Sequence, residues 1–152
     1  MKIIYIHHGN RLKTNVIQDD LSVLGEEDCL FVSKLLNNPE VKASAKAIYS
    51  STHFRCKKTA DIINSHLNLP IIADSRLNEY KSFENETWEN CLNRIINCID
   101  DIIEKYSPND TVICVTSGVN ISAFICKAFN IIPTNNTPFI KVPSCSPMIF
   151  EY

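Results

Sequence analysis

Three short segments of this sequence carry histidine, arginine and serine side chains directly after apolar runs, where they could bind a phosphate group. They are His7-His8-Gly9, Ser50-Ser51-Thr52-His53-Phe54-Arg55 and Thr116-Ser117-Gly118. Each segment is predicted to end a β-strand and to lead into a turn or a helix. Open α/β sheets bind ligands at the carboxyl ends of their strands, and a helix N-terminus with free backbone N–H groups attracts anions. The three segments therefore predict a phosphate pocket.

The rest of the sequence alternates between strand and helix patterns. Short apolar runs predict strands at residues 2–6, 47–50, 70–73, 111–116, 139–142 and 148–152. Helical spacing of apolar residues predicts helices at about residues 21–36, 55–67, 87–106 and 118–128. Such alternation is typical of βαβ units around a parallel sheet. We therefore expect one domain over residues 1–152, a three-layer α/β/α sandwich with a mostly parallel central sheet.

Several side chains can be assigned to the core or the surface from this pattern. Ser22 is the expected N-cap of the first helix. Its core-facing positions are expected to be Leu24, Phe31, Val32, Leu35 and Leu36. His53 and His66 are expected at the surface. Most of the 7 cysteines are expected to be small core residues.

Composition and charge argue against several functional classes. The net charge is -2 and the Lys and Arg residues are scattered, so no basic patch for nucleic acid or an anionic membrane is expected. No apolar tract has the length of a membrane span, and the first strand begins at once, which leaves no room for a signal peptide. We therefore expect a cytoplasmic protein. The sequence contains no signal for an oligomeric state.

Two other chemistries were weighed against the same residues. Cys114 could be a tyrosine-phosphatase nucleophile, but that loop requires an arginine where Asn120 stands. His7 and His8 could bind a metal, but adjacent strand residues point to opposite faces and no third ligand stands at a suitable spacing. The cysteines form neither a Cys-x-x-Cys pair nor a disulfide framework. No metal or structural cofactor is therefore predicted.

From end to end the chain resembles the histidine phosphatase superfamily, the phosphoglycerate mutase-like proteins. His7-His8-Gly9 is similar to the family's Arg-His-Gly, Leu21-Ser22-Val23-Leu24-Gly25 to its Leu-Thr-x-x-Gly, and residues 50–60 to its Ser-Ser-Pro-x-x-Arg-x-x-x-Thr-Ala. Leu77-Asn78-Glu79 looks like the loop that carries the general acid. Glu86-Thr87 with Arg94 is similar to the Gly-Glu-Ser helix start of the small phosphatase branch. Five matches in the correct order make the resemblance specific.

The resemblance implies hydrolysis of a phosphate ester in two steps. His8 would be the nucleophile and form a phosphohistidine, and Glu79 would protonate the leaving oxygen. Arg55 would bind the phosphate, together with His7, Ser117 and Gly118. No cofactor is implied, and the substrate would be a phosphorylated small molecule or a phosphoprotein. A mutase role is less favoured, because the chain is shorter than the mutases and has lost pocket charges.

Two expected phosphate-binding groups are changed in this chain. His7 replaces the arginine before the nucleophile, and Ser117 replaces the family's second histidine. Losing one preorganised donor typically costs about 10²- to 10³-fold in rate, so two losses could cost roughly 10⁴-fold.

Three accounts remain open at this point. In a slow phosphatase, protonated His7 and the Ser117 hydroxyl, with the Gly118 N–H, would partly replace the lost groups, and activity would rise as pH falls through about 6.5. An inactive relative would only bind a phosphorylated ligand or protein. A phosphocarrier would accept a phosphoryl group on His8 and release it slowly.

Overall fold

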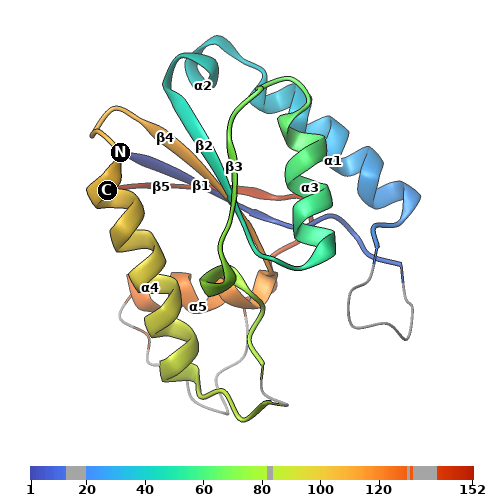
Figure 1. The fold of residues 1–152 in the computed structure, drawn as a ribbon. Helices are drawn as coiled ribbons and strands as arrows, with labels where there is room; N and C mark the ends of the chain where they lie inside the picture. Colours follow the sequence, from blue (N-terminus) through green and yellow to red (C-terminus); the bar gives the residue numbers. More distant parts are fainter. Residues whose placement is uncertain (13–19, 82–83, 130, 132–139) are drawn as a thin grey trace.

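The computed structural model describes residues 1–12, 20–81, 84–129, 131 and 140–152 (Figure 1). In chain order the elements are β1 (Lys2–His7), α1 (Val23–Leu36), α2 (Pro39–Ser44), β2 (Ala45–Ser50), α3 (Phe54–Asn64), β3 (Ile71–Ala73), the 3₁₀ helix η1 (Ser75–Leu77), α4 (Trp88–Lys105), β4 (Thr111–Thr116), α5 (Gly118–Ala128) and β5 (Pro147–Glu151). None of the described helices combines the length and hydrophobicity needed to cross a membrane.

A five-stranded sheet in the order β3-β2-β4-β1-β5 forms the centre of the fold. β1, β2, β3 and β4 run parallel, and only β5 pairs antiparallel, at the edge beside β1. The order places the carboxyl ends of β2, β4 and β1 in a row. Beyond these ends the Ser51 N–H donates to the Val115 carbonyl at 3.0 Å, and the His8 N–H to the Thr116 carbonyl at 3.0 Å. The three segments with candidate phosphate-binding residues, 7–9, 50–55 and 116–118, are therefore neighbours.

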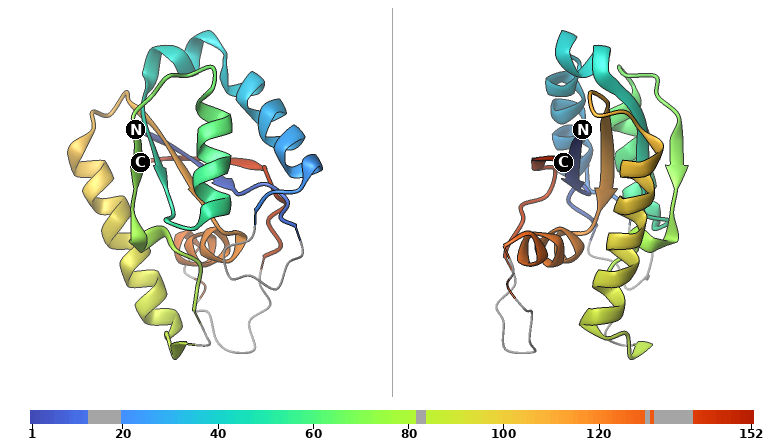
Figure 2. Two further views of the ribbon diagram at one scale, coloured as in Figure 1. Left: turned by 45° about the vertical axis from the view of Figure 1, so that its right-hand side comes forward. Right: turned by 90° about the vertical axis from the view of Figure 1, so that its left-hand side faces the viewer.

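Helices cover both faces of this sheet. On one face Ile4 and Ile6 of β1 pack in a core cluster with residues of α1 and α3, among them Val32 and Ile63. On the other face Ile3 and Tyr5 belong to a cluster with α4 and α5. Figure 1 shows the sheet between α1 with α3 and the long helix α4, and Figure 2 shows the same layers from two further directions. The predicted α/β/α arrangement with a mostly parallel sheet is confirmed.

The expected core face of α1 is wrong for three of its five positions. Leu24, Phe31 and Leu35 are 68%, 63% and 51% exposed. The helix instead buries Gly25, Cys29, Val32, Ser33 and Leu36. Gly25 and Cys29 face the loop after β1, which passes so close that a Cβ at Gly25 would lie 2.1 Å from the Asn10 carbonyl oxygen. This close approach sets the rotation of the helix, which apolar spacing alone does not reveal.

Three further expectations differ from the structure. The short helix α2, with Asn38 as N-cap and a proline at its first position, was not predicted. Residues 140–142 of the expected strand at 139–142 are not a strand, because their hydrogen bonds go to the Ser122 hydroxyl and the His7 ring instead of a neighbouring strand. Phe139 lies outside the described residues. The last strand begins at Pro147 and ends at Glu151.

The N-terminal turn of α1 is docked on the loop that follows β1. Ser22 caps the helix as predicted, with its hydroxyl accepting the Gly25 N–H at 3.0 Å, and its own N–H donates to the Asn10 carbonyl at 2.8 Å. A Cβ at Gly9 would lie 2.7 Å from the Gly25 carbonyl oxygen. A Cβ at Gly25 would collide with the Asn10 backbone. The two glycines thus allow α1 to support the loop that carries His8.

Replacing Gly25 by alanine should destabilise the protein, because the added methyl group meets backbone that can move only with the His8 loop. We expect a loss of about 1–3 kcal/mol in the free energy of unfolding, measured by urea denaturation. Leu24→Ala is the matched control: this side chain is 68% exposed, so its change should stay within about 0.5 kcal/mol. Equal stability of Gly25→Ala and wild type would contradict this packing.

Candidate active site

His8 lies directly after β1 and is 7% exposed. Its Nδ1 lies 2.8 Å from the Gly9 carbonyl oxygen, which can only accept, so Nδ1 carries the proton and donates it. Nε2 therefore has a lone pair, and it accepts a hydrogen bond from Arg55 Nε at 3.0 Å. Burial lowers the pKa of His8 to about 3, in spite of the Gly9 hydrogen bond. His8 is thus a neutral imidazole whose unprotonated nitrogen is Nε2.

Arg55 connects His8 to Glu79. It stands in the first turn of α3 and is 2% exposed. Besides contacting His8, it donates from Nη2 to Glu79 Oε2 at 2.5 Å, an ion pair whose carboxylate side is 36% exposed. A buried guanidinium requires such partners, because an unpaired charge would lose its hydration without compensation. The predicted residues His8, Arg55 and Glu79 therefore form one connected group, and their catalytic roles stay predictions.

The loop that carries Glu79 is held by side chains whose roles sequence reasoning missed. Asn120 of α5 donates from Nδ2 to the carbonyls of Leu77 at 2.9 Å and Asn78 at 2.7 Å. The Asn78 side chain in turn accepts from the Ser51 hydroxyl and from the Thr52 N–H and hydroxyl, at 2.8, 2.9 and 2.9 Å. The segment before Arg55 and the segment before Glu79 are thus fastened to each other. A polar residue two positions after a strand-end glycine was the available signal for Asn120.

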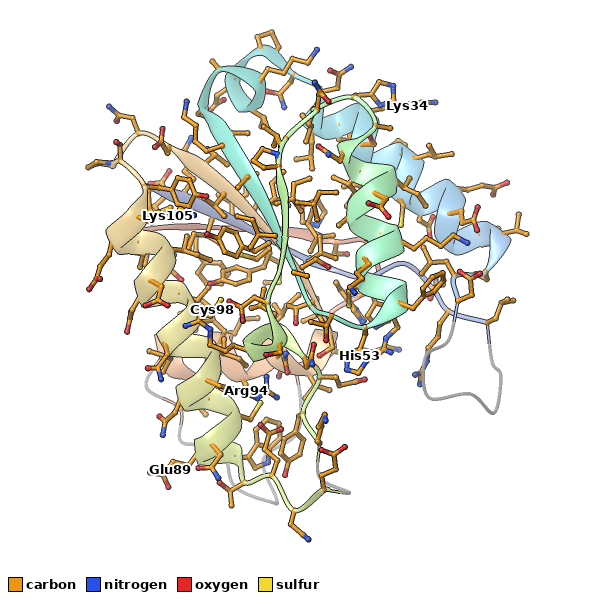
Figure 3. All side chains as sticks on the ribbon, viewed as in Figure 1. Lys34, His53, Glu89, Arg94, Cys98 and Lys105 are labelled. Atoms are coloured by element: carbon orange, nitrogen blue, oxygen red, sulfur yellow. The ribbon has the colours of Figure 1, made fainter. Side chains whose placement is uncertain are left out.

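Arg94 fastens the same loop from α4. Figure 3 shows its side chain reaching from the helix toward η1. Nη1 donates to the carbonyls of Arg76 and Asn78, both at 2.6 Å, while Nε pairs with Glu86 at 2.5 Å. The Glu86, Thr87 and Arg94 pattern noted in the sequence therefore acts in the fold, with Thr87 as N-cap of α4 and the ion pair holding Arg94 in place.

His7 is half-buried beside His8, with 4.5 Å between the two ring centroids. Its Nδ1 donates to the Val142 carbonyl at 2.8 Å, which leaves Nε2 as an acceptor. Burial lowers the pKa of His7 below its ordinary value of 6.5, although hydrogen bonds to Val142 and Pro143 oppose this shift. At neutral pH the residue that replaces the family's arginine is therefore uncharged.

The two residues at the end of β4 have different surroundings. Gly118 faces the His7 ring, and a Cβ there would lie 2.9 Å from His7 Cε1. Ser117 is 1% exposed, and its hydroxyl accepts the Asn120 N–H at 3.3 Å, as an N-cap of α5 would. The Ser117 side chain lies beneath the surface, which does not favour direct contact with a phosphate. Phosphate binding by Ser117 stays a prediction.

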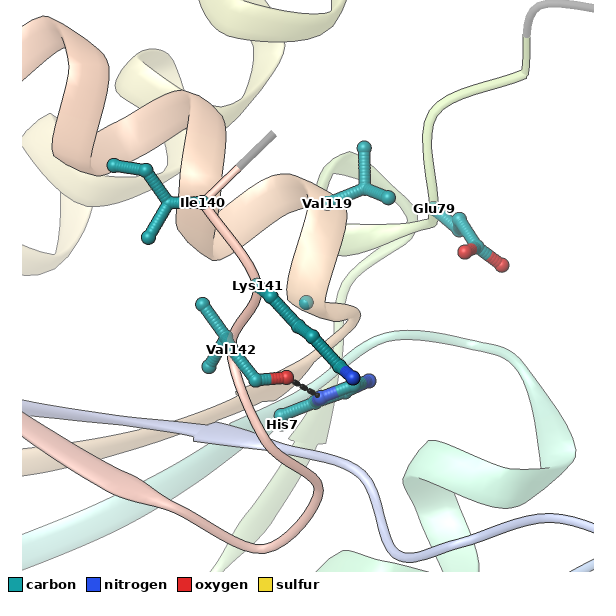
Figure 4. A pocket seen from close by; sticks show the side chains of 7 residues that line it. His7, Glu79, Val119, Ile140, Lys141 and Val142 are labelled. Atoms are coloured by element: carbon teal, nitrogen blue, oxygen red, sulfur yellow. Dashed lines mark hydrogen bonds between the residues drawn. The ribbon is translucent and has the colours of Figure 1, made fainter. Parts of the chain in front are cut away.

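A pocket of about 280 Å³ opens beside these residues (Figure 4). Its lining residues are His7, Glu79, Gly118, Val119, Ile140, Lys141 and Val142. The hydrophobic members form an apolar wall opposite the Glu79 carboxylate. Within the described part of the chain, no three His, Cys, Asp or Glu side chains gather as metal ligands would.

His53 and His66 were both predicted to lie at the surface, and the prediction is correct for His66 alone. His66 is exposed, as expected. His53 is only partly exposed, and its Nε2 is buried with no hydrogen-bond partner among the described residues. His53 is the N-cap of α3, two residues before Arg55. Burial, and to a smaller extent the positive charge of Arg55, lowers the pKa of His53. All seven cysteines are buried free thiols, in agreement with the core assignment.

The model of the histidine phosphatase superfamily (branch 1) matches residues 17–89, a range that contains Arg55 and Glu79. Over this range, just under half of the chain, the sequence is similar to the histidine phosphatase superfamily.

Several solved structures share the fold of this chain. A mycobacterial glucosyl-3-phosphoglycerate phosphatase complexed with VO3 is 15% identical with a TM-score of 0.76, and the match covers 97% of this chain and 90% of that one. Bacillus stearothermophilus YhfR is 21% identical, with a TM-score of 0.76 and coverage of 99% and 90%. Phosphoserine phosphatase from Entamoeba histolytica, in complex with 3-phosphoglyceric acid, is 16% identical, with a TM-score of 0.73 and coverage of 98% and 89%. No curated protein matches the sequence.

The neutral state of His8 predicts how stability depends on pH. The pKa of His8 is about 3 in the folded protein and about 6.5 in the unfolded chain. The unfolded chain therefore binds a proton first as the pH falls. His8 should lower the free energy of unfolding by about 1.4 kcal/mol per pH unit between these two values.

His8→Gln, which keeps a hydrogen-bonding side chain without a titrating ring, should remove this part of the pH dependence. Urea denaturation of both proteins between about pH 4 and about pH 7 measures the difference. Parallel curves for wild type and His8→Gln would show that His8 is not held neutral.

Proposed function

We propose that the protein is a phosphomonoesterase that acts through a phosphohistidine on Nε2 of His8. One observation carries this proposal: buried Arg55 donates at once to His8 Nε2 and to the Glu79 carboxylate. This contact supports the proposed roles of His8 as nucleophile, Arg55 as phosphate-binding cation and Glu79 as acid. The bound substrate would be a phosphorylated small molecule or a phosphoprotein. The seven free thiols support a reducing location such as the cytoplasm.

The first chemical step follows from an exchange of partners at Arg55. In the free protein its N–H groups are occupied by His8 and Glu79. Substrate phosphate oxygens are stronger acceptors than an imidazole, so they would take over these N–H groups. The exchange would free the Nε2 lone pair for attack on phosphorus and release Glu79 from its ion pair.

The reaction would then proceed through two successive displacements at phosphorus. The Nε2–P bond forms as the ester P–O bond breaks, and Glu79, which would take up a proton from solvent after it leaves its ion pair with Arg55, gives this proton to the departing oxygen. Water next attacks phosphorus while Glu79 takes a proton from it, the N–P bond breaks, and inorganic phosphate leaves. Arg55 would stabilise charge on the phosphoryl oxygens in both displacements.

The activity is expected to be low, since His7 is neutral at pH 7 and Ser117 is buried. The same observation favours a second candidate, an inactive relative that binds a phosphorylated ligand or protein. Relative to a family member with both groups, the loss would be roughly 10⁴-fold.

Hydrolysis of para-nitrophenyl phosphate by four proteins separates the candidates: wild type, His8→Ala, His66→Ala and the double variant His7→Arg/Ser117→His. His66→Ala is the matched control, because this histidine is exposed at the far end of α3. A working phosphatase requires slow turnover that disappears in His8→Ala and persists in His66→Ala. Turnover that survives His8→Ala would overturn the proposal. A silent wild type with an active double variant would favour the binding protein.

The pH profile of the wild type gives a second readout. Because burial lowers the pKa of His7 below 6.5, its cationic form appears only at lower pH, and turnover should rise as pH falls from about 6.5. In His7→Arg the cation is permanent, so this rise should flatten. A wild-type rate that climbs through neutral pH would contradict a role for protonated His7.

A further inference from the structure

Lys141 is the only lysine or arginine among the residues that line the described pocket. Figure 4 shows its side chain extending from the pocket wall toward the ring of His7. His7 itself donates Nδ1–H to Val142 and keeps only an acceptor on its other nitrogen. A phosphate oxygen needs a donor, so a neutral His7 cannot hold it. An ammonium group that lines the same pocket can.

The backbone that carries Lys141 is fixed at the pocket. The Ile140 N–H donates to the Ser122 hydroxyl of α5 at 2.9 Å, and the Val142 carbonyl accepts from His7 at 2.8 Å. Slightly further on, the Cys145 N–H donates to the His7 carbonyl at 2.9 Å. These bonds tie the segment to both β1 and α5, so the flexible lysine stem starts from a defined point beside the nucleophile strand.

The Lys141 ammonium has no carboxylate partner among the described residues. Lys58, by contrast, pairs with Asp20 and Glu26, and Arg55 pairs with Glu79. An unpaired cation at a pocket that lacks two family phosphate ligands is available for an anion. Lysine suits such a task, because its compact charge on a four-carbon stem adjusts to the position of the ligand.

We infer that Lys141 is a phosphate-binding residue of this pocket, and that its ammonium group supplies a second positive charge in place of the groups lost at positions 7 and 117. The inference rests on the proposed function in placing the phosphate next to His8. Arg55 then contacts the phosphate from the α3 side, and Lys141 from the side of the segment before β5. The apolar wall of Val119, Ile140 and Val142 faces the ester group, which favours substrates with an uncharged leaving group.

Direct binding of inorganic phosphate tests this inference without relying on turnover. Isothermal titration calorimetry at low ionic strength compares wild type, Lys141→Ala, Lys141→Arg and Lys34→Ala. Lys34 is an exposed lysine of α1 and serves as the matched control (Figure 3). Lys141→Ala should weaken phosphate binding about 10-fold or more, while Lys141→Arg and Lys34→Ala should stay within about threefold of wild type.

Several results would overturn the inference. These are unchanged phosphate affinity in Lys141→Ala, equal weakening in Lys34→Ala, or no phosphate binding by the wild type. An effect of Lys141→Ala that is confined to KM for a carboxylate-bearing phosphoester, with phosphate binding intact, would also overturn it, because Lys141 would then contact the leaving group.

Failure of the proposed function gives a different result. If the wild type binds phosphate through Lys141 but hydrolyses no ester, the inference stands and the phosphatase proposal fails. If the wild type hydrolyses aryl phosphate through His8 and Lys141→Ala changes neither phosphate affinity nor kcat/KM, the phosphatase stands and the inference fails.

Discussion

The buried guanidinium of Arg55 is the constraint on which the site depends. At 2% exposure it can keep its charge only with partners close at hand, and it finds them in His8 Nε2 at 3.0 Å and the Glu79 carboxylate. The same hydrogen bond that satisfies Arg55 fixes the tautomer of His8, because Nε2 must accept and Nδ1 must donate to Gly9. Arg55 therefore fixes the positions of both the His8 ring and the Glu79 carboxylate.

The fold brings these partners together from distant parts of the chain. Parallel strands in the order β2-β4-β1 put three carboxyl ends side by side, and the glycine contacts at Gly9 and Gly25 bring α1 against the His8 loop. The Glu79 loop follows the edge strand β3, and side chains from α4 and α5 donate hydrogen bonds that hold its position. Stability and site geometry thus share the same contacts, so changes in the scaffold should alter chemistry as well.

Sequence reasoning located the five strands of the sheet, with one strand predicted wrongly at residues 139–142, and the group His8, Arg55 and Glu79. These depend on local patterns: apolar runs that end in polar residues, and motifs in a fixed order. It wrongly predicted that Leu24, Phe31 and Leu35 of α1 are buried. Helical spacing shows that the helix has an apolar face, but it does not show that the side with Gly25 and Cys29 packs against the loop after β1. Arg94 was noted as part of a motif, but its contacts and those of Asn120 go to carbonyls far along the chain, and the sequence does not specify these partners. The neutral state of His7 depends on burial, and its tautomer depends on the Val142 carbonyl, a partner 135 residues away that accepts from Nδ1.

The most direct measurement of the central claim is the protonation state of the His8 ring, read from ¹⁵N chemical shifts in ring-nitrogen NMR spectra at neutral pH, with His8→Gln to assign the signals. The account predicts a neutral ring with the proton on Nδ1 and a hydrogen-bonded, unprotonated Nε2, and a changed Nε2 shift when inorganic phosphate takes the Arg55 N–H groups. A doubly protonated ring, or a neutral ring with the proton on Nε2, would contradict it.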